Sequence, residues 1–326
     1  MSTRRVVIAL GGNALLDRTM TDTAEAMRAS AKAASEVIAD IVKEGWEVVI
    51  THGNGPQVGR ILLQNELAKE VTAPMPLDIC GAQSQGQIGF LLVTAIRNTF
   101  RERGLAHPVV NVLTLTRVQA DDPAFDHPTK PIGPYYGEAE ARRLASDLGY
   151  HMAAAGAAGG SWRRMVPSPR PCAIEYADEI IQLARGGAIV VACGGGGVPV
   201  VEVESSLVGV EAVVDKDLAS CVLAKEVQAD ALLILTDVDA VYAGYGTPRQ
   251  RRLAEISAAE ARTLLGDREF GVGSMGPKVD AAASFAAATG NPAYIARLQD
   301  GVLALSEQAG TRVLPDRAPV HGNRAA

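Results

Sequence analysis

The sequence predicts an α/β protein in which helices cover both faces of a mainly parallel sheet. Short β-branched apolar runs, of the kind that parallel sheets bury, recur along the 326 residues. Stretches with helical periodicity separate these runs, and this alternation is typical of a parallel sheet. Hydrophobic residues make up 48% of the chain, with many Ala and Gly and only 4% aromatic residues, which favours helices packed closely on a sheet.

The first apolar run, Val6–Leu10, ends in a turn that contains Gly11, Gly12 and Asn13. Glycines at such a place let backbone N–H groups approach a phosphate or carboxylate without side chains in the way. An ordinary strand-to-helix turn explains this motif equally well when it is taken alone. The recurrence of the pattern after later strands favours the anion-binding interpretation.

The next elements follow the same scheme. Asp22-Thr23-Ala24-Glu25 has capping-box spacing and predicts a helix that ends near Glu44. The strand Glu47–Thr51 runs into His52, Gly53 and Asn54, and Pro56 suits the first turn of the helix that follows. Further along we expect helices over Gln64–Glu70 and Gln83–Arg103 and a strand over Val109–Leu115.

Residues 117–171 differ from the rest in composition. They are dense in proline, glycine and charge and poor in strand patterns, and they contain one short helix pattern over Glu138–Leu148. A structureless loop of this length is improbable within a compact domain, so we interpret the segment as an inserted subdomain.

The strand–helix alternation resumes after the insert. A helix over Glu175–Arg185 leads to the strand Ala188–Ala192, which ends in the run Gly194, Gly195, Gly196 and Gly197. Asp215 caps a helix that carries Lys216 and Asp217, and the strand Ala231–Leu235 ends in Thr236 and Asp237. The remaining expected elements are a helix over Ser257–Leu265, a flexible run over Gly271–Gly276 before an Ala-rich helix, strands over Ala293–Ala296 and Thr311–Leu314, and a disordered tail over 315–326.

Charge and composition exclude several classes of function. The net charge of −6 gives no basic footprint for nucleic acid or an anionic membrane. No apolar run reaches the roughly 18–20 residues of a membrane span, and the Gly11–Asn13 turn interrupts the only stretch that imitates a secretory signal. The cysteines, at positions 80, 172, 193 and 221, show no metal or redox spacing and are expected to be reduced packing thiols in a cytoplasmic protein.

Several anion-binding turns at one edge of a sheet suit a ligand with many charged oxygens. Phosphoryl transfer is the chemistry that most requires such a site, because its catalysis is largely positioning and neutralisation of charge. Lys216 and Lys278 stand at helix starts, where the helix dipole disfavours a cation unless an anion is bound beside it. Lys130 lies between the prolines of the insert. Asp217 either orients these ammonium groups by ion pairing or is an ordinary acidic residue in the first turn of a helix. The histidines form no evident catalytic pair, which suits an acceptor that is already an anion.

The motifs resemble those of the carbamate kinases, a branch of the amino acid kinase superfamily. The similar stretches are ALGGNALL, THGNGPQVG, TKPIGPYY, CGGGGVPVV, VDKDLAS and GVGSMGPKVDAA, and they extend over nearly the whole chain. The resemblance implies an open three-layer αβα sandwich with a protruding subdomain, the amino acid kinase fold. It also implies reversible transfer between ATP and carbamate to give ADP and carbamoyl phosphate, in a cytoplasmic homodimer that runs toward ATP, with Mg²⁺ on the nucleotide phosphates.

The resemblance also implies roles for particular residues. Carbamate and the phosphoryl group would bind at Gly11, Gly12, Asn13, Gly53 and Asn54. Lys130, Lys216 and Lys278 would neutralise charge, with Asp217 organising them. The nucleotide side would comprise Gly194, Gly195, Gly196, Gly197, Thr236, Asp237, Tyr242 and Lys278. Residues 1–190, with the insert at about 117–171, would form the acceptor lobe, and 191–314 the nucleotide lobe.

One departure from the family pattern keeps an alternative open. Arg117 stands where glutamine is expected, followed by a segment that looks shorter than usual, and we expect it near the mouth of the acceptor site. A kinase of the same fold that acts on another small carboxylate, carbamate or phosphonate is therefore the second hypothesis. A nucleotide sensor without turnover is disfavoured because the complete set of lysines and Asp217 is present.

Overall fold

The computed structural model describes residues 4–11, 23–154, 161–270 and 275–316. Gly12, Asn13, the 271–274 part of the glycine run and the tail from 317 onward lie outside the described residues. Within the described ranges, no helix combines the length and the apolar character needed to cross a membrane.

The main sheet is almost entirely parallel, and its described part has the order β15-β17-β16-β12-β1-β2-β9-β3. The exception is the antiparallel pairing of β17 with β16, and because β15 pairs parallel with β17, these two edge strands run opposite to the other strands of this order. These strands are β1 (Arg4–Leu10), β2 (Trp46–His52), β3 (Val109–Asn111), β9 (Ile189–Val191), β12 (Ala231–Thr236), β15 (Glu255–Ser257), β16 (Ala293–Arg297) and β17 (Thr311–Leu314). The predicted α/β class with a mainly parallel sheet is confirmed.

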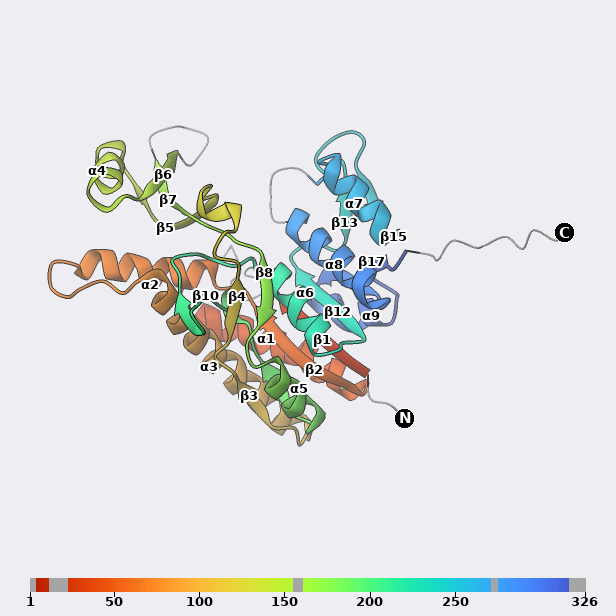
Figure 1. Ribbon diagram of the computed structural model, residues 1–326. Coiled ribbons are helices and arrows are strands. Elements are labelled where there is room, and N and C mark those ends of the chain that lie inside the picture. The colour runs from red at the N-terminus through yellow and green to blue at the C-terminus, as the bar shows by residue number, and fades with distance from the viewer. Residues whose placement is uncertain (1–3, 12–22, 155–160, 271–274, 317–326) are drawn as a thin grey trace.

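Helices cover the sheet on both faces, which makes the expected three layers (Figure 1). In β1, Val7 and Ala9 join the apolar core on one face, while Val6, Ile8 and Leu10 join the core on the other. The first core is completed by α5 (Ala177–Arg185), α6 (Lys216–Glu226), α7 (Ala258–Gly266) and α8 (Met275–Thr289), and the second by α1 (Ala24–Lys43), α3 (Leu77–Arg103) and α9 (Gly301–Leu305). Short 3-10 turns are η2 (Pro123–Phe125), η3 (Gly194–Gly196) and η4 (Leu298–Asp300).

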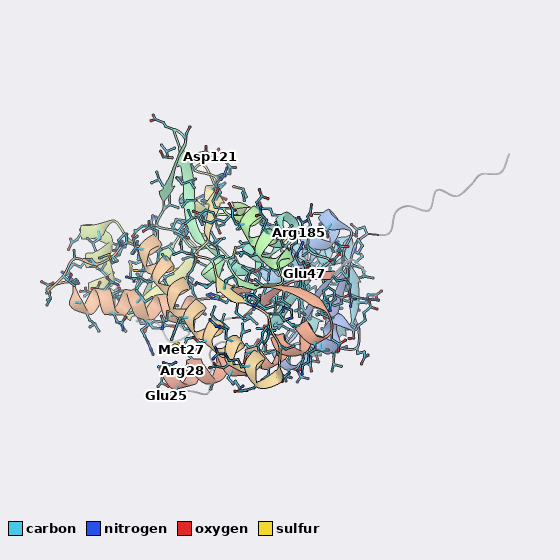
Figure 2. All side chains as sticks on the ribbon, turned by 90° about the horizontal axis from the view of Figure 1, so that it is seen from below. Glu25, Met27, Arg28, Glu47, Asp121 and Arg185 are labelled. Atoms are coloured by element: carbon cyan, nitrogen blue, oxygen red, sulfur yellow. The ribbon has the colours of Figure 1, made fainter. Side chains whose placement is uncertain are left out.

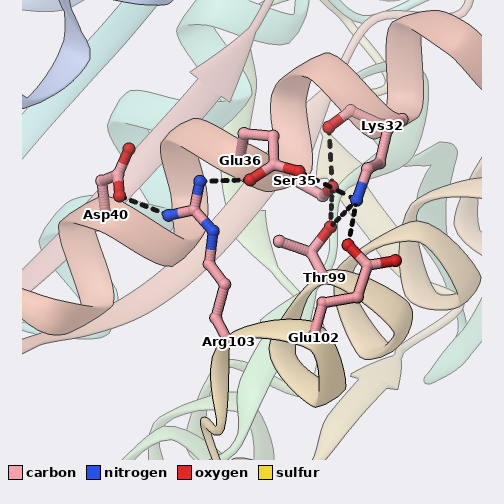
Figure 3. Close-up of polar contacts among 7 residues, drawn as sticks. All are labelled: Lys32, Ser35, Glu36, Asp40, Thr99, Glu102 and Arg103. Atoms are coloured by element: carbon pink, nitrogen blue, oxygen red, sulfur yellow. Dashed lines mark hydrogen bonds and ion pairs between the residues drawn. The ribbon is translucent and has the colours of Figure 1, made fainter.

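Polar contacts join α1 to α3 on the outer side of the second core (Figure 3). The buried hydroxyls of Ser35 and Thr99 share a hydrogen bond of 2.6 Å, and the Lys32 ammonium donates to Thr99 at 3.2 Å. Arg103 pairs with Glu36 and Asp40 of α1. These contacts join the middle of α1 to the C-terminal end of α3.

A second sheet, in the described order β11-β10-β4-β8, lies beside the main one. Its strands are β4 (Leu115–Val118), β8 (Pro171–Ile174), β10 (Val198–Val203) and β11 (Ser206–Gly209). The single strand expected over Val109–Leu115 is therefore wrong, because β3 and β4 belong to different sheets. At the break, the side-chain amide of Gln85 of α3 bonds both the N–H and the carbonyl of Thr114 at 2.9 Å, and this carbonyl also accepts from the Val198 N–H at 3.0 Å.

The insert has a sheet of its own, which corrects the expectation that it is poor in strands. In the described part, β5 (Lys130–Tyr136), β7 (Trp162–Val166) and β6 (His151–Ala154) form this sheet in the order β5-β7-β6, with α4 (Glu138–Leu148) beside it as expected. Figure 1 shows these elements projecting above α2 (Gly55–Ala68). The insert begins near Asp121, on the opposite side of the molecule from Glu25, Met27 and Arg28 at the start of α1 (Figure 2).

Several other expected elements are present within a few residues of their predicted bounds, but α2 and α3 begin nine and six residues before the helices expected over Gln64–Glu70 and Gln83–Arg103. Thr23 caps α1 by accepting a hydrogen bond from the Ala26 N–H, and Pro56 lies in the first turn of α2. Asp215 caps α6, and Lys278 lies in the first turn of α8. The short antiparallel pair β13 (Val241–Ala243) and β14 (Arg251–Leu253) was not expected.

Candidate active site

The turns that follow β1, β2, β9 and β12 lie in a row along one edge of the main sheet. The Gly53 N–H donates to the Leu10 carbonyl at 3.1 Å, and the Gly11 N–H donates to the Leu235 carbonyl at 2.9 Å. These bonds continue the strand pairing past the strand ends, so the turns are held side by side. This is the edge of a parallel sheet at which ligands bind.

The glycine run after β9 fits closely against its neighbours. Gly195 has φ of 68°, and a Cβ there would lie 2.2 Å from Asn54 Nδ2. Gly197 has φ of 84°, and a Cβ there would lie 1.9 Å from the Thr116 hydroxyl, which donates to the Gly196 carbonyl at 2.7 Å. Only glycine combines this backbone conformation with such close approach.

This packing changes one expectation from the sequence. Gly194–Gly197 was expected on the nucleotide side with Thr236 and Asp237, but Gly194 packs against His52 at the end of β2 and Gly195 against Asn54 in the turn that follows. The strands β2 and β1 separate β9 from β12, a distance of about 14 Å at the usual strand spacing. The glycine run therefore packs beside the turn that was expected to bind the acceptor.

Two lysines and one aspartate form a buried cluster at the start of α6. Asp217 is only 3% exposed and accepts from Lys278 Nζ at 3.1 Å on one oxygen and from Lys216 Nζ on the other. Burial acts to raise the Asp217 pKa, but the two ammonium groups hold that pKa below its ordinary value. Burial lowers the pKa of Lys216, and the charge of Lys278 lowers it further, against the attraction of Asp217.

The third lysine reaches the same place from the insert. Lys130, the first residue of β5, donates to the Asp215 carboxylate at 3.0 Å. Asp215 also caps α6 by accepting from the Asp217 N–H at 3.0 Å. The structure thus brings Lys130, Lys216 and Lys278 together around the positive end of one helix, although they come from three separate parts of the chain.

A cleft of about 580 Å³ opens beside this cluster, between the insert and the helices α7 and α8. Figure 1 shows the two sides, with the insert strands over α2 on one and α7 and α8 on the other. Its walls include Thr129, Lys130, Ser168 and Arg170 from the insert, Asp215 and Leu218 from the start of α6, and Arg262, Pro277 and Asp280 from α7 and α8. The cleft is large enough for a nucleotide phosphate chain. Lys130 lines it directly, and Asp215 and Pro277, which line it too, directly precede Lys216 and Lys278 in the chain.

None of the residues expected on the nucleotide side is among the described residues that line this cleft, although Pro277, next to Lys278, is one of them. Thr236 and Asp237 lie beside Gly11, where a Cβ would come within 3.7 Å of the Thr236 Cα. The Tyr242 hydroxyl donates to Asp239 at 3.1 Å, and its ring packs edge-to-face on Tyr245. The described residues that line the cleft do not include Thr236, Asp237 or Tyr242.

Sequence reasoning missed two contributions to the site. Arg170, at the end of the insert, pairs with Asp280 of α8 at 3.0 Å, which joins the two walls of the cleft. Ser220 of α6 shares a hydrogen bond of 2.6 Å with Thr51 at the end of β2, which fixes α6 over the strand turns. The prolines around Arg170 were the only sequence signal for its role. A serine within a helix, such as Ser220, gives no sequence signal for its contact.

His52, at the end of β2, is fully buried beneath the glycine run. Its Nδ1–H donates to the Gly53 carbonyl at 3.0 Å, and its Nε2 has no hydrogen-bond partner among the described residues. Burial lowers the His52 pKa to about 4, with a further contribution from the charge of Lys216. The imidazole is therefore neutral at physiological pH and supports the Gly53 peptide.

We expect His52 to make the fold sensitive to mild acid. In the unfolded chain the His52 imidazole is protonated below about pH 6.5, whereas in the folded chain it is protonated only below about pH 4. The free energy of unfolding therefore falls as the pH drops between these values. The loss between pH 7 and pH 5 is about 2 kcal/mol of unfolding free energy. Urea unfolding at both pH values measures it, with His52→Asn as the comparison, because an asparagine amide can still donate to Gly53. An equal loss in both proteins would contradict the assignment.

Arg117 does not lie at the mouth of the acceptor site, which corrects a second expectation. Its guanidinium donates to Glu175 at 2.5 Å and lies 3.5 Å from Glu202. The neighbouring Thr116 faces the glycine run, and successive side chains of a strand point to opposite faces. Hydrogen bonding to Glu175 raises the Arg117 pKa, so the guanidinium is held in a structural ion pair.

Comparisons with known proteins identify the family of this chain. The model of the amino acid kinase family matches residues 4–297. A carbamate kinase of Pyrococcus horikoshii is 46% identical over 95% of this chain and 99% of its own length, and one of Trichomonas vaginalis is 42% identical over 96% and 100%. The structure of the carbamate kinase from Giardia lamblia bound to AMP-PNP superimposes with a TM-score of 0.91, at 42% identity over 97% of this chain and 99% of that one. The chain therefore belongs to the amino acid kinase family and, within it, to the carbamate kinases.

Proposed function

We propose that this chain transfers a phosphoryl group between ATP and carbamate, giving ADP and carbamoyl phosphate. The observation that carries the proposal is the convergence of Lys130, Lys216 and Lys278 on Asp215 and Asp217. This cluster lies between the strand turns and the cleft, where a phosphoryl group in transfer would need its charge neutralised. In the reaction a carbamate oxygen bonds to the γ-phosphorus as the bond from phosphorus to the ADP oxygen breaks.

The acceptor and the phosphoryl group are proposed to bind against the strand turns. Gly11, Gly12, Asn13, Gly53 and Asn54 would line this side of the site. The Gly11 and Gly53 N–H groups are already engaged by the Leu235 and Leu10 carbonyls, so their role would be to leave room for the acceptor. The Asn54 amide is held by its donation to Ser84 at 2.8 Å. The glycine run 194–197 packs on Asn54 and is assigned to this acceptor side. No general base is required, because carbamate is already an anion.

The three lysines are proposed to act on the γ-phosphoryl oxygens. Asp217 holds Lys216 and Lys278 on its two oxygens, so their ammonium groups are oriented before substrate arrives. Lys130 comes with the insert and would close the arrangement from the other side. The nucleotide would occupy the cleft, with its phosphates toward Lys278 and with Thr236, Asp237 and Tyr242 on the side of the C-terminal lobe. Residues 1–190 and 191–314 are proposed as the acceptor and nucleotide lobes, with the glycine run as the exception.

Mg²⁺ is proposed to arrive with the nucleotide and to supply further neutralisation of phosphate charge. Such an ion keeps phosphate oxygens and waters as most of its ligands and needs few protein carboxylates. The site is consistent with an ion that needs few protein ligands, because its most buried carboxylate, Asp217, is already paired with two ammonium groups.

The reaction is proposed to run toward ATP, because an acyl phosphate transfers its phosphoryl group more readily than ATP does. The opposite direction gives a clean test of the acceptor. We expect ADP formation from ATP to need ammonium and bicarbonate together, since these combine to carbamate, and to stay at background with bicarbonate or acetate alone. Full activity with acetate would instead favour the second hypothesis, another small acceptor.

Arg117 provides a further check on that second hypothesis. Because its guanidinium is held by Glu175 and Glu202, we expect Arg117→Gln to change the KM for carbamoyl phosphate by less than about twofold. Steady-state kinetics measures this directly. A tenfold rise in that KM would mean that Arg117 reaches the acceptor after all.

A homodimer and a cytoplasmic location are also proposed. In support of a dimer, α3 exposes Ile79 and Phe90, and the nearby β11 exposes Leu207 and Val208. In support of a reducing compartment, none of the four cysteines forms a disulfide, and burial raises the pKa of Cys80, Cys193 and Cys221. Light scattering at micromolar concentration should give twice the chain mass.

A further inference from the structure

One face of the insert sheet carries two cations with an apolar pair between them. In the antiparallel pairing of β5 and β7, Lys130 lies opposite Val166 and Ile132 lies opposite Arg164. Residues two apart on a strand, and residues opposite each other on paired strands, share a face. Lys130 and Arg164 therefore project from the same face, on either side of Ile132 and Val166.

The apolar pair rests on the acceptor lobe. Ile132 and Val166 are buried in a small cluster with Val58 of α2 and with Leu77 and Cys80 of α3. This cluster is much smaller than the two cores that cover the main sheet. A few apolar contacts hold the insert against the lobe but specify its position poorly, since the hydrophobic effect is non-directional.

Arg164 supplies a directional contact at the end away from Lys130. Its Nη2 donates to Glu211 Oε2 at 2.6 Å, and its guanidinium stacks on the Tyr150 ring at 3.7 Å from the centroid. The Arg164 side chain is only 13% exposed. The other oxygen of Glu211 accepts from the N–H of Leu77, the first residue of α3, at 3.2 Å. Glu211 thus ties the insert sheet to the start of α3.

The partners of both cations lie on one short connection. Glu211 and Asp215 are four residues apart between β11 and α6, and between them the Val213 N–H donates to the Pro167 carbonyl of the insert at 3.0 Å. Lys130 meets Asp215 at one end of this connection, and Arg164 meets Glu211 at the other. A shift of the sheet at Arg164 would therefore be transmitted through two rungs of the β5–β7 ladder to Lys130.

We propose that Arg164 and Glu211 are positioning residues, which hold the insert sheet where the Lys130 ammonium can meet the transferring phosphoryl group. This inference rests on the proposed function. Neither residue touches the cleft beside Lys130; both line a separate cavity of about 310 Å³ between α2 and the insert. Their effect on the reaction passes through Lys130.

Substitution of either residue should lower turnover while nucleotide binding is retained. We expect Arg164→Gln and Glu211→Gln to reduce kcat about tenfold or more, because a displacement of about 1 Å in a charged group is costly in the transition state. The KM for ADP should stay within about twofold, since the walls formed by α7 and α8 are unchanged. Arg164→Lys keeps the charge but loses the planar, stacking group, and should have a smaller loss.

The decisive measurement is the same substitution in a chain that already lacks the lysine. If Arg164 acts through Lys130, then Lys130→Ala with Arg164→Gln should have the same kcat as Lys130→Ala alone. Arg142→Gln is the matched control, because Arg142 pairs with Glu138 at the exposed surface of the same insert and should leave kcat unchanged.

Other results would overturn the proposal. A wild-type kcat in both Arg164→Gln and Glu211→Gln, or a further tenfold loss in the double variant, would show that the pair does not act through Lys130. If Arg164→Gln does not fold, as judged by circular dichroism, Arg164→Lys and Glu211→Gln are tested in the same two backgrounds. Failure of the proposed function is distinct, because the wild-type protein itself would then make no ATP.

Discussion

With alanine in place of Lys278, ATP formation should slow by two or more decades while ADP binding stays nearly unchanged. Lys278 is 6% exposed and contacts Asp217 at 3.1 Å, in the first turn of α8. A cation buried at a helix start is disfavoured by the helix dipole, and Asp217 supplies the counter-charge that holds Lys278 there. A charge that acts mainly on the transition state is seen in kcat rather than in substrate affinity.

Steady-state kinetics and calorimetric titration with ADP measure the two quantities separately. Lys225→Ala is the matched control, because Lys225 is an exposed lysine in the last turn of α6. Turnover within threefold of the wild type in Lys278→Ala would refute the assignment of this lysine. Loss of ADP binding with an unchanged kcat at saturation would assign it to nucleotide binding alone.

Replacing Asp217 with asparagine should damage both activity and stability. The change leaves Lys216 and Lys278 buried beside each other without their shared counter-charge. Breaking a buried ion pair by removing one partner costs about 3–5 kcal/mol, and the two ammonium groups then repel each other. The lysines would no longer be oriented, so kcat should fall by about two decades as well.

Urea unfolding gives the stability difference, and Asp147→Asn, at an exposed position of α4, is the control. We expect millimolar inorganic phosphate to restore part of the lost stability, because an anion between the lysines replaces the missing charge. A change below 1 kcal/mol in the absence of phosphate would mean that Asp217 does not balance the two lysines.

Local sequence signals were sufficient for the framework of the fold. The strand β12 follows from an uninterrupted apolar run, and α4 from its pattern and from Gly149, which ends the helix in the left-handed conformation. The capping of α1 by Thr23 and of α6 by Asp215 follows from the same local chemistry. These elements are set by residues close together in the chain, which sequence patterns describe well.

Elements that depend on distant partners could not be predicted in this way. The break between β3 and β4 lies at Thr114. Its backbone N–H and carbonyl are hydrogen-bonded to the side-chain amide of Gln85, about 30 residues earlier in the chain. The strands of the insert are short and only half-buried, so they lack the apolar runs by which buried strands are identified.

The site divides along the same line. The glycine turns and the three lysines could be identified because each has a local motif. Their pairing could not, since Lys130 and Asp215 are separated by 85 residues and Lys278 and Asp217 by 61. The placement of Gly194–Gly197 beside Asn54 depends on sheet order, which no local pattern contains.

The measurement that tests the central claim most directly is ATP formation by the purified protein from ADP, Mg²⁺ and carbamoyl phosphate, with acetyl phosphate in parallel and Lys278→Ala as the control. We predict rapid ATP formation that prefers carbamoyl phosphate and is lost in the variant. A protein that binds ADP but forms no ATP from carbamoyl phosphate would contradict the proposed reaction.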